Sequence, residues 1–140
     1  MNINDTMKEV HDLAIEKGWH EKPKSPLEAL MLMVSELSEA AEEVRKGTPP
    51  VYQLKDIGCQ QEPCIATVVQ SSRHFEDPRF PNFNHSNSQN KLEGELIELA
   101  DAVIRIFDYA EFRGFDLEEA IAMKHAYNKF RSYKHGNKLL

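Results

Sequence analysis

The chain has 140 residues, a net charge of −6, 41% hydrophobic and 29% charged residues, which fits one soluble globular domain spanning 1–140 rather than a disordered or fibrous chain. No apolar run approaches the roughly 20 residues that a membrane span needs, and the N-terminus lacks a signal-peptide pattern, so we expect a cytoplasmic protein with no membrane partner. The acidic balance argues against stable nucleic-acid binding, because such proteins usually neutralise phosphates with a basic surface.

The first predicted helix spans residues 4–17. Asn4 or Asp5 is its expected N-cap, because both side chains accept hydrogen bonds from a first helical turn. Gly18 is the expected stop, since glycine adopts the left-handed conformation that ends many helices.

The second predicted helix begins clearly. Ser25 and Glu28 form a capping-box pattern around Pro26, which suits the first helical position, and the helix continues to Lys46 before Gly47. Its apolar residues form one arc, expected to face the core of a helical bundle: Leu30, Met33, Val34, Leu37, Ala40, Ala41 and Val44.

The segment 48–91 differs in composition, being rich in Pro, Gly, Asn, Ser and Gln. We expect an insertion between two helices that is a lid, a small hairpin or a mobile loop, with one short strand at 64–69. Cys59 and Cys64 are expected to be reduced, since no export signal precedes them. Zinc binding by this pair with His74 or His85 is the alternative, but their spacing is not that of the usual short cysteine pairs.

The third predicted helix covers residues 93–113, and the fourth covers 116–133. Asp116 and Glu119 repeat the capping-box pattern at the start of the fourth. The prediction is therefore an all-α protein, a four-helix bundle with one long crossover. The third helix has a broad apolar arc that four short helices cannot cover, so we also expect a partner subunit.

Acidic residues recur at helical spacing beside these apolar arcs. Glu36, Glu39 and Glu43 share one sector of the second helix, and Glu98 and Asp101 repeat the spacing on the third. Carboxylates this close repel one another, and a divalent cation such as Mg²⁺ would reverse that cost. The alternative is a pair of solvated acidic faces. Arg105 and Asp108, on the same side of the third helix, are expected to form ion pairs.

The fourth helix carries a polar face at i, i+3, i+4 and i+7. Lys124, Tyr127, Asn128 and Arg131 supply a cation, a hydroxyl, an amide and a guanidinium. Such a set suits phosphate recognition, because guanidinium groups offer fork-shaped donors and Lys a point charge. The alternative is a cationic strip that neutralises neighbouring acidic helices.

The combination resembles a known family. Glu36-x-x-Glu39, Glu98-x-x-Asp101 and Lys124-x-x-x-Asn128, within LMLMVSELSEAAEEVRKG, ELADAVIRIFDYA and KHAYNKFRSYKHGNK, are similar to the MazG-like members of the all-α nucleoside triphosphate pyrophosphatase superfamily. The resemblance covers both ends of the chain, about two-thirds of it, and the segment 48–91 departs from it.

The resemblance implies hydrolysis of a nucleoside triphosphate to the monophosphate and pyrophosphate, with a deoxynucleoside triphosphate as the favoured substrate. Magnesium, for which manganese can substitute, would be held by Glu36, Glu39, Glu98 and Asp101, with Glu39 as the candidate general base. The phosphates would be bound by Lys124, Tyr127, Asn128 and Arg131, and His135 would contact the end of the phosphate chain. A homodimer or a dimer of dimers is also implied.

Two other functions remain open at this point. One keeps the fold and changes the substrate, as in the related phosphoribosyl-ATP pyrophosphohydrolases. The other is a non-catalytic helical interaction protein whose acidic faces are only solvated. A di-iron carboxylate bundle is disfavoured, because no predicted helix has the Glu-x-x-His ligand pair of such sites.

Overall fold

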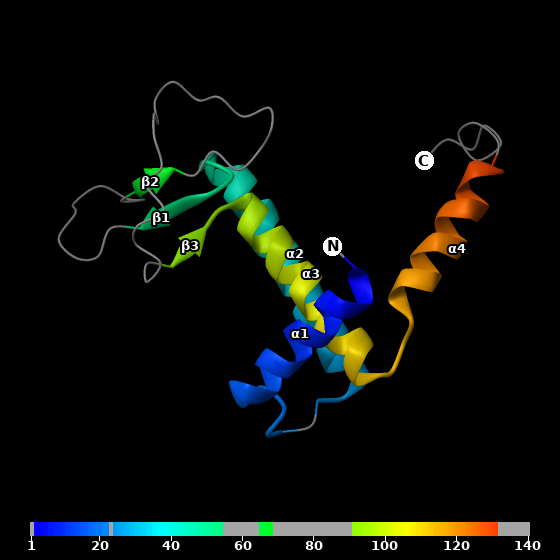
Figure 1. Ribbon diagram of the computed structural model, residues 1–140. Coiled ribbons are helices and arrows are strands. Elements are labelled where there is room, and N and C mark those ends of the chain that lie inside the picture. Colours follow the sequence, from blue (N-terminus) through cyan, green and yellow to red (C-terminus); the bar gives the residue numbers. More distant parts are fainter. Residues whose placement is uncertain (1, 23, 55–64, 69–90, 132–140) are drawn as a thin grey trace. The chain divides into compact units, whose positions relative to one another are not determined.

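The computed structural model describes residues 2–22, 24–54, 65–68 and 91–131, and these are mostly helical, as an all-α fold requires (Figure 1). The elements in chain order are α1 (Ile3–Glu16), α2 (Pro26–Lys46), β1 (Tyr52–Leu54), β2 (Ile65–Val68), β3 (Leu92–Glu93), α3 (Glu95–Phe112) and α4 (Leu117–Lys129). Two compact units are formed: unit 1 comprises Met1–Pro23 and Ile106–Leu140, and unit 2 comprises Lys24–Arg105. The arrangement of the helices as a four-helix bundle stays a prediction.

In unit 2, α2 begins and ends where the sequence predicts. The Ser25 hydroxyl accepts a hydrogen bond from the Glu28 N–H at 3.2 Å, and the Glu28 carboxylate accepts one from the Ser25 N–H at 2.6 Å. Gly47 ends the helix with φ +67°, the left-handed conformation that glycine adopts without steric cost. The predicted capping box, proline position and stop are all confirmed.

The fully buried side of α2 overlaps the apolar arc only at Ala40. Leu30, Val34, Leu37 and Val44 are 47–58% exposed, and the buried residues of the helix are Glu36, Ala40 and Glu43. The prediction that the whole arc forms the core is therefore wrong for the single chain. The reason is that unit 2 packs the neighbouring sector of the helix, which holds carboxylates and small side chains, toward its interior.

Three short strands form an antiparallel sheet in the order β2-β1-β3. The strand predicted within 64–69 is confirmed as β2, and it pairs with β1 through Tyr52↔Val68, Gln53↔Thr67 and Leu54↔Ile65. Strands β1 and β3 were not predicted; both are too short for a two-residue alternation to be recognisable. Helix α3 consequently begins at Glu95 instead of Glu93, since Leu92 and Glu93 pair with β1.

Gly94 makes the turn from β3 into α3 with φ +115°. A side-chain Cβ at this position would lie 2.5 Å from the Pro50 carbonyl oxygen and 2.7 Å from that of Pro49, which is closer than real contacts allow. The Gly94 carbonyl in turn accepts hydrogen bonds from the N–H groups of Ile97 and Glu98. A residue without a side chain therefore sets where α3 starts beside β1.

In unit 1, α1 begins at Ile3, one residue earlier than predicted. Asn2, rather than Asn4 or Asp5, is the N-cap, and its side chain accepts hydrogen bonds from the N–H groups of both. Asp116 caps α4 as predicted by accepting from the Glu119 N–H at 2.9 Å. The start of α1 is joined to the start of α4, because the Asn4 side-chain amide donates to Asp116 at 3.2 Å.

Candidate functional site

Three carboxylates from α2 and α3 converge in unit 2. Glu36, Glu98 and Asp101 each place an oxygen so that these ligand atoms lie within 4.8 Å of one another. Glu36 and Glu98 are only 6% exposed, while Asp101 is half-buried. We call these three residues the acidic cluster. The predicted juxtaposition of the two acidic motifs thus holds for three of their four residues.

The electrostatics of the acidic cluster are unfavourable for a protein without a bound cation. Burial raises the pKa of Glu98, and the negative charges of Glu39 and Asp101 raise it further. Burial also raises the pKa of Asp101, with Glu36 adding to the effect and Arg105 partly offsetting it. Both groups therefore resist ionisation where they stand, which is how like charges behave when confined in a partly dehydrated site.

Arg105 supplies part of the missing positive charge. Its Nε donates to the Glu36 carboxylate at 2.5 Å, which confirms the predicted ion pairing of this arginine. Lys91, paired with Glu93, lowers the pKa of Asp101 only from a distance. The pKa of Glu98 is raised despite these two cations, so a further positive charge would stabilise the acidic cluster.

Glu39 is exposed on α2 and stands outside the group of mutually close ligand atoms, although its charge is near enough to raise the pKa of Glu98. Its carboxylate is thus available for a role other than ligation. Whether it is a metal ligand or a general base stays a prediction.

Glu43 has a structural role that the sequence did not indicate. Its carboxylate accepts hydrogen bonds from the Thr48 hydroxyl at 2.6 Å, the Tyr52 hydroxyl at 2.8 Å and the Lys46 ammonium at 3.0 Å. Burial alone would raise the pKa of Glu43, but these hydrogen bonds outweigh it and lower the pKa. The third acidic residue of the predicted sector therefore joins α2 to β1 instead of joining the acidic cluster.

The predicted phosphate-binding residues lie on or just after α4, in unit 1. Lys124, Tyr127, Asn128 and Arg131 are all exposed. The Lys124 ammonium lies 5.0 Å and the Arg131 guanidinium 5.9 Å from the centre of the Tyr127 ring. The polar face is thus real, with two cations gathered around one aromatic ring, and its joint action with the acidic cluster of unit 2 stays a prediction.

Other predicted residues have different outcomes. Asp108 pairs with His11 and His20, which the sequence did not single out, and it does so through hydrogen bonds. His135 and the residues of the alternative zinc site, Cys59, Cys64, His74 and His85, lie outside the described residues.

Comparison with known proteins gave no match among protein-family models, curated proteins or solved structures. Within the part of the chain that the structure describes, no helix is both long enough and apolar enough to cross a membrane.

The raised pKa values in the acidic cluster allow us to predict how the stability of the folded protein responds to pH and Mg²⁺. The folded-state pKa values of Glu98 and Asp101 are raised above their ordinary values of 4.5 and 3.8, so the folded chain keeps protons that the unfolded chain has released. Their contribution to stability is therefore present below those ordinary values and is lost as pH rises through the folded pKa values.

The contribution of Glu98 is measured by thermal unfolding of chelator-treated protein, followed by circular dichroism from pH 4.5 to neutral. Wild type is compared with Glu98→Gln, because the lowered pKa of Glu43 affects the stability of both proteins equally. Added Mg²⁺ should restore stability at neutral pH, by about 2.7 kcal/mol at about 100 times its Kd. Equal unfolding curves with chelator and with Mg²⁺ would contradict a cation site here.

Proposed function

We propose that this protein is a Mg²⁺-dependent nucleoside triphosphate pyrophosphohydrolase of the MazG-like kind, cleaving the α–β phosphoanhydride bond to give the monophosphate and pyrophosphate. The observation that carries the proposal is the convergence of Glu36, Glu98 and Asp101, two of them buried, with the pKa of Glu98 and Asp101 raised. Perturbed carboxyl groups concentrated at one place are more common at functional sites than elsewhere.

The donor set fits Mg²⁺ better than it fits a softer metal. All three groups offer carboxylate oxygens, the hard ligands that Mg²⁺ prefers, and no nitrogen or sulfur donor belongs to this cluster among the described residues. Mn²⁺ accepts similar ligands, so it should substitute. When bound, such an ion neutralises charge on phosphate oxygens and makes a bound water more acidic.

The residues of this chain have distinct proposed roles. Glu36, Glu98 and Asp101 hold the cation. Glu39, exposed and outside the trio, accepts the proton of the attacking water. Phosphate oxygens are bound by hydrogen bonds from Lys124, Asn128, Arg131 and Tyr127. Lys124 and Arg131 carry the positive charges, which are the donor types that recognise phosphate most often.

A homodimer is part of the proposal. The apolar residues that unit 2 leaves exposed recur along α2 and α3: Leu30, Val34, Leu37, Val44, Leu99 and Val103. Large apolar side chains left exposed repeatedly along a helix are typical of a protein interface. Light scattering during size-exclusion chromatography should give at least twice the mass of 16.1 kDa, and Leu37→Glu should give a monomer. Leu37→Met, which keeps the apolar surface, should assemble like the wild type, and a monomeric wild type at micromolar concentration would contradict the proposal.

The reaction itself is tested by product analysis. The purified chain is incubated with each common nucleoside triphosphate and deoxynucleoside triphosphate, with Mg²⁺ or with chelator, and the products are separated by ion-exchange chromatography. Monophosphate and pyrophosphate, formed only with the cation, are the expected products. Diphosphate and orthophosphate would mean that the bond is assigned wrongly. Turnover of phosphoribosyl-ATP alone would favour the other substrate class, and no turnover would favour a non-catalytic interaction protein.

A further inference from the structure

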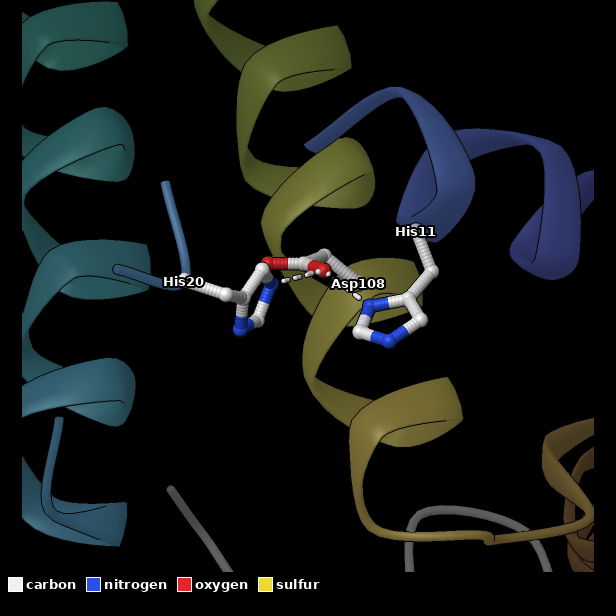
Figure 2. A group of neighbouring side chains, drawn as sticks. All are labelled: His11, His20 and Asp108. Carbon is white, nitrogen blue, oxygen red and sulfur yellow. Dashed lines mark hydrogen bonds and ion pairs between the residues drawn. The ribbon is translucent and has the colours of Figure 1, made fainter. Parts of the chain in front are cut away.

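A second group of metal-ligating side chains lies in unit 1, distinct in its chemistry from the acidic cluster. Figure 2 shows His11 of α1, His20 of the turn that follows α1, and Asp108 of α3 pointing toward one another. The Asp108 Oδ1 accepts hydrogen bonds from His11 Nδ1 at 2.7 Å and from His20 Nε2 at 2.8 Å. The three donor atoms lie within 4.8 Å of one another. We call them the histidine cluster.

The turn after α1 brings the two imidazoles together. Gly18 adopts φ +76°, its N–H donates to the Ile15 carbonyl, and the Trp19 N–H donates to the Ala14 carbonyl. This double hydrogen bond is the Schellman motif, which reverses the chain at a helix end. His20 is thereby carried back against α1, and its ring centre lies 4.8 Å from that of His11, edge to face.

The surroundings of the histidine cluster are partly dehydrated but open to an incoming ion. The side chains of His11, His20 and Asp108 are 16%, 26% and 20% exposed. The Phe112 ring stacks on His20 with centres 5.4 Å apart, which makes one wall of the site apolar. Charge interactions are stronger in such a place than in open water, and all three ligands can still be reached.

The donor set and its dimensions suit a tetrahedral transition-metal ion. Two imidazoles and one carboxylate leave one position for water, which is the ligand count of many zinc sites. Tetrahedral zinc, with bonds of about 2.0–2.1 Å, separates its donor atoms by about 3.3 Å. The present separations from Asp108 to the two histidines, 2.7 and 2.8 Å, would have to widen only slightly.

We propose that His11, His20 and Asp108 form a binding site for Zn²⁺ or a similar borderline divalent ion, which ties α1 and its following turn to α3. Imidazole nitrogen favours Zn²⁺, Co²⁺ and Ni²⁺, whereas Mg²⁺ binds nitrogen poorly. The histidine cluster and the acidic cluster therefore take different ions. Metal binding at the histidine cluster replaces the two hydrogen bonds to Asp108 by metal bonds. The proton of each coordinating nitrogen then passes to solvent or to the other nitrogen of the same ring.

The test is metal titration of the full chain after removal of metals by chelator. Co²⁺ serves as the spectroscopic probe, because tetrahedral Co²⁺ absorbs visible light far more strongly than hexahydrated Co²⁺, and Zn²⁺ affinity is measured by competition. The wild type should bind roughly one equivalent, in the presence of excess Mg²⁺, with a tetrahedral spectrum. His20→Gln and Asp108→Asn should each lose at least about 10-fold in affinity, as disturbed metal sites commonly do.

Two matched variants should bind like the wild type. His125→Gln changes an exposed histidine of α4 outside the histidine cluster, and Glu98→Gln changes the acidic cluster. Circular dichroism checks the helical content of each variant, and His11→Gln replaces any cluster variant that fails to fold.

Three outcomes would overturn the proposal: no binding at micromolar Co²⁺ or Zn²⁺, unchanged binding in His20→Gln and Asp108→Asn, or a thiolate-to-cobalt absorption band that disappears in a Cys59→Ser/Cys64→Ser variant. The first would leave the histidine cluster as a hydrogen-bonded contact only. The last would assign the ion to the cysteines.

Discussion

Glu98→Gln is expected to abolish the proposed pyrophosphohydrolase activity while making the metal-free protein more stable at neutral pH. The glutamine keeps the shape of a side chain that is 6% exposed but removes its charge. Without that charge the repulsion among the carboxylates of the acidic cluster is weaker, so the free energy of unfolding should rise by about 1 kcal/mol. The loss of a cation ligand should lower kcat/KM by at least about 100-fold, beyond what changes around metal ligands usually cost.

Paired assays of activity and thermal unfolding, with Mg²⁺ and with chelator, measure both effects. Mg²⁺ should no longer raise the unfolding temperature of the variant, and the stability gain should vanish near pH 4.5, the ordinary pKa of a glutamate. Glu95→Gln, the same change at an exposed position of α3, should behave as the wild type. A variant that is inactive and less stable in chelator would mean that Glu98 has a structural role instead.

Gly94→Ala is expected to be the most destabilising small substitution in unit 2. The new Cβ would meet the backbone oxygens of Pro50 and Pro49 at 2.5 and 2.7 Å, and the φ of +115° is unfavourable for any residue with a side chain. Neither obstacle can be relieved by rotating a side chain. Strain and overpacking together should cost about 3 kcal/mol or more, and lower the unfolding temperature by about 10 °C.

Gly47→Ala is the matched control. Gly47 also has a positive φ, +67°, but a Cβ there meets no atom within 4 Å. Only the conformational cost, about 1 kcal/mol, should remain. Urea unfolding followed by circular dichroism compares the two variants, and equal losses of stability would show that the contact with Pro49 and Pro50 is unimportant. The proposed pyrophosphohydrolase activity should also fall in Gly94→Ala, even where the chain is folded. The reason is that Glu98 lies in the first turn of α3, and its N–H donates a hydrogen bond to the Gly94 carbonyl.

Helix boundaries were the part of the fold most open to prediction, because they depend on neighbouring residues. Ser25, Glu28 and Pro26 determine the start of α2 through hydrogen bonds and a fixed φ that involve only each other. The start of α3 was misplaced, since Leu92 and Glu93 take part in pairing with a strand far away in the sequence. Such pairing is invisible to local spacing.

The candidate site was predictable to the same extent. The spacing of Glu36, Glu98 and Asp101 indicated that helices could bring carboxylates together, and the structure does so. Spacing could not show that Glu43, in the same sector, is bound by Tyr52 and Thr48. The histidine cluster could not be predicted from local spacing, because its residues come from α1, a turn and α3. The one local signal was a histidine on each side of the Gly18 turn.

Helix α2 buries Glu36 and Glu43 and exposes Leu30, Leu37 and Val44, the reverse of a helix in a self-sufficient monomer. Under the proposed function, a cation stabilises one side of this helix and a second chain covers the other. Dilution would then remove the second chain and chelation the cation, and both would lower the stability of α2. Each treatment would lower the unfolding temperature more in the presence of the other. Unfolding temperatures for this chain should therefore be compared only at matched protein and Mg²⁺ concentrations, or a change of sample will be mistaken for the effect of a mutation.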